Sequence, residues 1–213
     1  MKYSSLSINF CLILILIQFS KTQLKSQFGW GGTFNHELYH RYTNPKDSTE
    51  FSRSAGSVLL NFGIGPKFWF GGKKFSVSAE ATANIGLLGL ALRDYKGLGT
   101  ASVPILVKFN FNGLSTLERD GLLGFYFGGG IQYSRTELYG LKEKFKTAGV
   151  VRDWFRTYVV QAGYGFGLSG FALSGYLRIG HDPDVKSTVL ILGMQYDFNV
   201  PMLRKITTPE SSL

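Results

Sequence analysis

The sequence predicts an all-β fold, specifically an eight-stranded antiparallel up-and-down transmembrane β-barrel. Three observations predict it. Large apolar residues alternate with small or polar ones in eight separate segments, the charged residues of those segments share one face, and long connections alternate with short ones along the chain. A chain of 213 residues suits one domain of ordinary size.

The composition departs from that of a soluble globular domain. Only 17% of residues are charged, against roughly 25% in typical soluble domains, while 15% are aromatic and 27 are glycine. A large part of the surface is therefore expected to avoid water.

The first 27 residues have the layout of a secretory signal peptide. Lys2 precedes an apolar run from Ile8 to Phe19, which is short for a membrane-spanning helix, and polar residues follow it. A retained anchor is the alternative. Removal between Ser20 and Gln27 would take Cys11 with it, leaving a mature chain without a thiol or disulfide.

The formal net charge is +9, and loss of the three lysines in the leader would leave about +6. Nucleic acid is a poor partner for an exported protein, so we expect none. Anionic lipopolysaccharide is a better match for a modest basic excess.

The eight segments read as strands because the side-chain period is two. In the last of them Leu190, Leu192, Met194 and Tyr196 alternate with small or polar residues. The expected strands are 28–36, 55–70, 75–89, 102–112, 122–134, 157–170, 172–180 and 188–198.

The position of the charges distinguishes a membrane barrel from a soluble one. The charged residues within the expected strands all lie on the face that carries glycine, serine and amides: Lys67, Glu80, Lys108, Arg178 and Asp197. The opposite face is apolar, which suits lipid. We expect these five to form an interior charge network, since buried charges need partners. Eight strands enclose little more than side chains, so little room for a pore is expected.

The connections predict the orientation. The barrel is expected over 28–198, with both termini periplasmic, a short periplasmic tail at 199–213, and external loops at 37–54, 90–101, 135–156 and 181–187. Aromatic residues then gather at the periplasmic rim, where an interfacial girdle belongs, and Tyr133 and Tyr158 mark the outer rim.

One sequence matches a zinc-protease motif, since His36-Glu37-Leu38-Tyr39-His40 has the form H-E-x-x-H. That motif requires a helix. If the first strand instead continues outward, with His36 and His40 on the same face, the imidazoles are about 13 Å apart and cannot share a zinc ion. We expect no metal, cofactor or catalytic residue here.

Two further motifs are weak. Gly165-Phe166-Gly167-Leu168-Ser169-Gly170 fits G-x-G-x-x-G, but a strand follows it where dinucleotide binding needs a helix. His181-Asp182-Pro183-Asp184 faintly resembles the His-x-Ser region of outer-membrane lipid A deacylases, with proline in place of the serine. A loop turn with acidic residues is the preferred interpretation.

The loop from Arg135 to Arg156 is the most basic stretch outside the leader. Lipopolysaccharide phosphates would attract it, although a solvated charged loop without a ligand is the simpler interpretation.

The closing segment, Gly193-Met194-Gln195-Tyr196-Asp197-Phe198, has the order of the closing-strand signal read by the barrel assembly machinery, with Gly193, Tyr196 and Phe198 at its defining positions. On this pattern the chain resembles small outer-membrane β-barrels of the OmpA-like and PorT-like kind common in Bacteroidetes. The tail is too short for the peptidoglycan-binding domain of many OmpA-like proteins, so cell-wall anchoring is not expected.

The resulting expectation is a non-enzymatic, multi-pass barrel in the bacterial outer membrane. Its external loops would contact lipopolysaccharide or a protein partner, in envelope integrity, adhesion, or a secretion or uptake assembly. The alternatives are an outer-membrane hydrolase that uses His36, Glu37, His40 or His181, and passive transport.

Overall fold

The computed structural model describes residues 27–43, 57–87, 97–117, 122–147, 152–184 and 186–207. Its strands are β1 (Gln27–Thr43), β2 (Ser57–Gly71), β3 (Phe75–Ala81), β4 (Ala83–Gly86), β5 (Leu98–Asn112), β6 (Leu122–Tyr139), β7 (Phe155–Leu168), β8 (Phe171–Asp182) and β9 (Ser187–Asn199). Three short helical segments accompany them: η1 (Gly113–Ser115), α2 (Glu143–Thr147) and α3 (Val200–Thr207).

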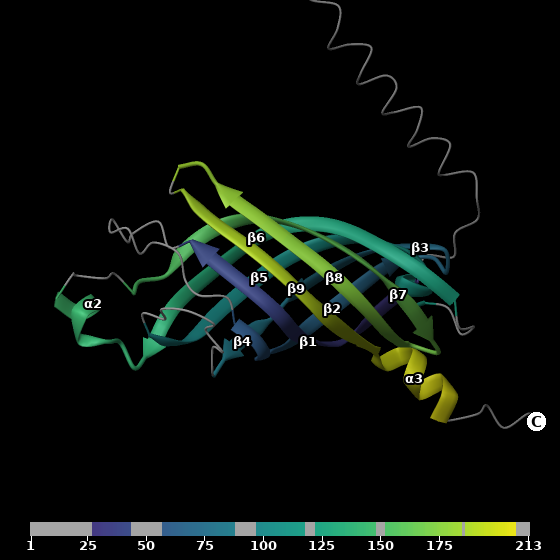
Figure 1. Ribbon diagram of the computed structural model, residues 1–213. Coiled ribbons are helices and arrows are strands. Elements are labelled where there is room, and N and C mark those ends of the chain that lie inside the picture. Colours follow the sequence, from purple (N-terminus) through teal and green to yellow (C-terminus); the bar gives the residue numbers. More distant parts are fainter. Residues whose placement is uncertain are drawn as a thin grey trace, which may run out of the picture.

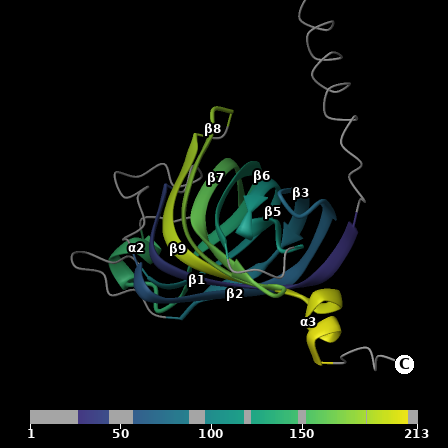
Figure 2. The ribbon, with the colours of Figure 1, turned by 90° about the vertical axis from the view of Figure 1, so that its right-hand side faces the viewer.

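The strands form a closed antiparallel ring. Each strand pairs with its neighbours in sequence, and β1 pairs with both β2 and β9, so the sheet has no free edge. β3 and β4 are two halves of one strand interrupted at Thr82, and both pair with β2 and β5. The ring therefore has eight strands, and the predicted antiparallel up-and-down barrel is confirmed (Figures 1 and 2).

Several strands are longer than the sequence pattern indicated. β1 continues to Thr43, β6 to Tyr139 and β8 to Asp182, so the expected connections at 37–54, 135–156 and 181–187 begin within strands. The turn between β7 and β8 is Ser169-Gly170, not residue 171. Both turn residues have positive φ (51° and 87°), which is the geometry that a two-residue hairpin requires and that Gly170 adopts freely.

The two ends of the barrel carry different elements. α3 follows β9 directly and lies at one end, whereas α2 lies in the connection between β6 and β7 at the other (Figure 1). We refer to them as the α3 end and the α2 end. Within the part of the chain that the structure describes, no helix is long and apolar enough to cross a bilayer.

The connection after β5 folds under the α3 end. Leu114, Ser115 and Leu117 are buried, and the Ser115 hydroxyl donates to the Lys73 carbonyl over 2.6 Å. The Asn199 amide donates to the Thr116 carbonyl over 3.0 Å. Over its described residues, 113–117, this connection is thus a plug in one mouth of the barrel.

Inward and outward faces differ in chemistry as well as burial. Along β9 buried and exposed residues alternate almost perfectly, with Gln195 and Asn199 inside and Leu190 and Leu192 outside. Most buried residues are therefore polar, although an apolar cluster that includes Phe155, Val189 and Ile191 is also buried, and large apolar side chains form the outer surface.

Candidate functional site

The most concentrated chemistry in the described residues is the polar interior near the middle of the barrel. Glu80 is its centre: one carboxylate oxygen lies 2.5 Å from the Lys108 amine and the other 3.0 Å from the Lys67 amine. Lys67 also contacts Asp197, at 2.7 Å. Four of the five residues expected inside thus form one chain of ion pairs, drawn from β2, β3, β5 and β9.

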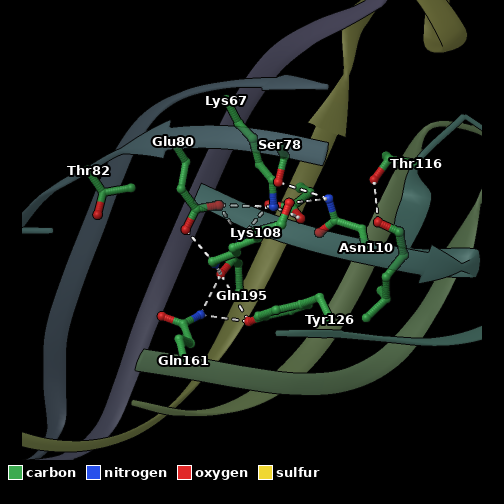
Figure 3. Close-up of polar contacts among 12 residues, drawn as sticks. Lys67, Ser78, Glu80, Thr82, Lys108, Asn110, Thr116, Tyr126, Gln161 and Gln195 are labelled. Carbon is green, nitrogen blue, oxygen red and sulfur yellow. Dashed lines mark hydrogen bonds and ion pairs between the residues drawn. The ribbon is translucent and has the colours of Figure 1, made fainter. Parts of the chain in front are cut away.

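Gln195 joins this chain to the neighbouring side chains. Its amide nitrogen donates to Glu80 (3.0 Å) and Asp197 (2.9 Å), and its amide oxygen accepts from Lys108 (2.8 Å) (Figure 3). The Tyr126 hydroxyl also donates to that oxygen, at 3.3 Å, and accepts from the Gln161 amide at 2.7 Å. Each acidic oxygen and each ammonium group of the ion-pair chain therefore has partners.

The fifth residue, Arg178, lies apart from these ion pairs. It donates to the side-chain oxygens of Gln161 (2.7 Å) and Gln132 (2.9 Å), and its guanidinium is 3.8 Å from Glu37. Because Gln161 also contacts Tyr126 and Gln195, Arg178 is linked to the first cluster through neutral amides and a hydroxyl, without a direct ion pair.

Three buried carboxylates were missed by the sequence pattern: Glu37, Glu137 and Asp182. Glu37 was assigned to a loop, yet it is fully buried and accepts hydrogen bonds from the amides of Asn61 and Asn84. Asp182 is also fully buried and accepts from Arg156 over 2.8 Å. Continuing the alternation of the first expected strand by one residue would have found Glu37, and continuing that of 172–180 by two would have found Asp182. Glu137 follows buried Thr136 and has a positive φ of 53°, so it departs from the alternation.

An irregularity in β1 corrects the expected geometry of the two histidines. The pairing of β1 with both β2 and β9 shifts register between Glu37 and Tyr39, which marks a β-bulge at Leu38. His36 points outward and stacks on Phe62 at 4.7 Å, whereas His40 is buried in the interior. The expectation that both lie on the same face was wrong.

The H-E-x-x-H match is therefore strand, not helix, with its histidines on opposite sides of the barrel wall. Among the residues that the structure describes, no group of three or more His, Cys, Asp or Glu side chains is placed to hold a metal ion.

The other two motifs are also structural. Gly165 and Gly167 lie in β7, and a Cβ at either would come within 2.0 Å of a backbone carbonyl oxygen. His181 is exposed at the end of β8, and its Nδ1 lies 3.1 Å from the Ser187 carbonyl across the hairpin. Asp182 accepts a hydrogen bond from the Asp184 amide at 3.1 Å, a local turn contact.

The closing-strand residues lie on β9 beside β1. Tyr196 faces outward and contacts Phe34, with ring centroids 5.8 Å apart, and Phe198 is exposed close to the α3 end. Gly193 faces inward, where a Cβ would lie 2.7 Å from the ring of Tyr176. Packing thus explains the glycine, and recognition by the assembly machinery stays a prediction.

These features define the class of the protein: a closed eight-stranded β-barrel with a filled, hydrogen-bonded polar interior and an apolar outer surface.

Comparison with known proteins adds structural neighbours of limited similarity. No protein-family model matches the chain, and the curated proteins contain no match. Among solved structures, Ail, the attachment invasion locus protein of Yersinia pestis, is 12% identical with a TM-score of 0.42, over 80% of this chain and 99% of that one.

The N-terminal β-barrel domain of Pseudomonas aeruginosa OprF is 10% identical with a TM-score of 0.42, over 80% of this chain and 99% of that one. Pseudomonas aeruginosa outer membrane protein OprG is 13% identical with a TM-score of 0.36, over 81% of this chain and 98% of that one. The class of this protein rests on its own strand pairing.

Proposed function

We propose that this protein is a non-enzymatic, multi-pass β-barrel of the bacterial outer membrane. Its external loops contact lipopolysaccharide or a protein partner, in envelope integrity, adhesion, or a secretion or uptake assembly. The same proposal has four further parts: membership of an OmpA-like or PorT-like family, a source in the Bacteroidetes, export by a cleaved leader, and insertion by the barrel assembly machinery.

The observation that carries the proposal is the inversion of polarity between the two faces. Large apolar side chains are exposed around the ring, with Ile64 at 69% and Val160 at 57%, while Lys67, Lys108 and Arg178 are fully buried. A continuous apolar exterior of this kind is far larger than the patches that soluble monomers tolerate. It matches the lipid-facing surface of a membrane barrel.

The distribution of aromatic residues supports the orientation. Towards the α3 end, outward-facing phenylalanines of β3, β5 and β6 stack on one another, with Phe111 and Phe125 only 4.6 Å apart. Towards the α2 end, Tyr133 and Tyr158 are exposed on the outer face. Aromatic belts at both interfaces are typical of membrane barrels, and they support a periplasmic α3 end and an external α2 end.

The connection between β6 and β7 supports a role for an ordered external surface. The Arg135 Nε donates to the Arg152 carbonyl over 2.8 Å, and Phe145 of α2 is buried although it lies in this connection. The described residues of this connection, 140–147 and 152–154, are held in this way and present charged groups at fixed positions to a partner. Crosslinking in native membranes, followed by identification of the crosslinked neighbour, would name that partner.

The membrane assignment predicts heat-modifiable mobility. We expect unboiled protein to migrate as a compact band on a denaturing gel, and boiled protein to migrate at its unfolded position. The reason is that a closed barrel without free edges resists detergent until heat opens it. The protein should also fractionate with outer membranes. Recovery as soluble periplasmic protein, with one gel position in both samples, would contradict the proposal.

The filled interior predicts that the barrel does not conduct ions. Trp69, Tyr126 and Arg178 are each at most 2% exposed inside the lumen, and the plug at Leu114 lies in the mouth at the α3 end. Purified protein in planar bilayers should give no single-channel steps above the lipid background. Stable, reproducible conductance from correctly folded barrels would favour passive transport instead.

A further inference from the structure

Two neighbouring hollows lie on the outer face of the barrel over β7 and β8, and we call them together the furrow. Its part near the α2 end is a hollow of about 410 Å³, lined on the outer face by Tyr158, Val160, Ile179 and His181. A larger and more open hollow of about 610 Å³ extends over β6 to β9 and includes Ala162, Tyr164, Gly175 and Leu177 in its lining. The two adjoin, because Val160–Ile179 and Ala162–Leu177 are successive outward-facing pairs of the same two strands.

The furrow exists because small residues replace large ones at its floor. Ala162 and Gly175 face outward on neighbouring strands, between Phe127 on one side and Met194 on the other. A Cβ placed on Gly175 would meet nothing within 4 Å, so the space above this glycine is open. On a lipid-facing surface such a space is filled by an acyl chain or by another protein.

The end of the furrow at the α2 end carries two arginines, Arg156 and Arg135, and the carboxylates of Asp182 and Asp184. Arg156 is the next outward-facing residue of β7 from Tyr158 towards the α2 end. Its guanidinium lies 4.8 Å from the Tyr158 ring centroid. The Arg156 Nε donates to buried Asp182 at 2.8 Å, and another guanidinium nitrogen lies 3.9 Å from exposed Asp184; these contacts hold the group in place while its side chain stays 37% exposed. Arg135 lies on the same face of the adjacent strand, two residues beyond Tyr133, the residue that pairs with Arg156.

We propose that this furrow binds lipid A, with Arg156 and Arg135 on a phosphate and one acyl chain lying from Tyr158 to Gly175. Two guanidinium groups above an apolar furrow match the polarity of a phosphorylated acyl lipid. The inference rests on the proposed function, because it needs the α2 end at the outer leaflet.

The dimensions suit this occupant. Eight residues separate Arg156 from Tyr164, or about 27 Å along the strand. With a strand tilt of about 40°, the furrow descends roughly 20 Å into an apolar band about 25 Å tall. The furrow thus extends from the interface through most of the hydrocarbon layer, as an acyl chain anchored at its phosphate would.

The test uses the full chain in detergent micelles and native mass spectrometry, with diphosphoryl lipid A and phosphatidylglycerol present at equal concentrations. We expect one lipid A molecule to be retained per barrel in preference to phosphatidylglycerol. Gly175→Leu, whose Cβ would meet nothing within 4 Å, adds bulk in the furrow and should weaken lipid A binding about tenfold. Ala79→Leu, which adds similar bulk on the outward face of β3, is the matched control and should bind normally.

The role of Arg156 is tested by Arg156→Gln combined with Asp182→Asn, so that no buried carboxylate is left unpaired. This variant should lose about tenfold in affinity for diphosphoryl lipid A and should no longer distinguish it from the dephosphorylated lipid. Lys146→Gln, which removes a positive charge from exposed α2, should change neither value.

Three outcomes would overturn the inference: equal retention of phosphatidylglycerol, equal effects of Gly175→Leu and Ala79→Leu, or conversion of a dimer to a monomer by Gly175→Leu. The last would show that a second copy of the chain fills the furrow. Each variant is first checked for heat-modifiable mobility. If the unaltered protein shows no heat-dependent shift on the gel, the proposed function itself is contradicted. If the barrels fold but do not prefer lipid A, only this inference is contradicted.

Discussion

Replacement of Glu80 by glutamine is expected to lower the free energy of unfolding by about 3 to 5 kcal/mol, the usual cost of removing one partner from a buried ion pair. Glutamine has the shape of glutamate but no charge. Lys108 then loses its only carboxylate within ion-pair distance among the described residues, and Lys67 retains only its ion pair with Asp197. Urea unfolding of barrels in lipid vesicles, followed by tryptophan fluorescence and gel mobility, measures the change.

The chain offers a matched control for this substitution. Glu143 pairs with Lys146 at 2.6 Å in α2, but both side chains are mostly exposed. Glu143→Gln is therefore expected to change stability by less than about 0.5 kcal/mol. Adding Lys108→Met to Glu80→Gln removes the stranded charge and should recover part of the loss. Equal, small effects of Glu80→Gln and Glu143→Gln would show that the interior ion pairs do not stabilise the barrel.

Substitution of alanine for Gly31 is expected to prevent closure of the barrel or to destabilise it by about 3 kcal/mol or more. Gly31 pairs with Asn199 where β1 meets β9. A Cβ at Gly31 would lie 1.6 Å from the Phe198 carbonyl oxygen, and a backbone atom cannot rotate away as a side chain can. The two strands would have to separate, which breaks the hydrogen bonds that close the ring.

The measurement is the fraction of refolded protein that runs at the compact position without boiling. Gly175→Ala is the control, because it adds the same methyl group where nothing lies within 4 Å. It should leave that fraction unchanged, with stability equal or up to about 1 kcal/mol higher. A Gly31→Ala barrel that folds and unfolds like the Gly175→Ala barrel would mean that the β1–β9 contact is not as close as described.

The sequence alone was sufficient to predict which segments form strands and which face of the sheet carries most of the charged residues. Alternation with period two is a local property, readable in β9 without knowledge of its neighbours, and it placed Lys67, Glu80, Lys108 and Asp197 on the face that is buried in the structure. The strand ends were less well predicted, because β1, β6 and β8 extend beyond the segments with strict alternation.

The tertiary structure alone decided which charges pair and which histidine is buried. The partners of Glu80 lie up to 115 residues away in sequence, and their register is set only when eight strands close into a ring. The bulge at Leu38 arises from the pairing of β1 with both neighbours, and it reverses the faces of all residues beyond it. Local patterning therefore determined the barrel, whereas ring closure determined the contents of its interior.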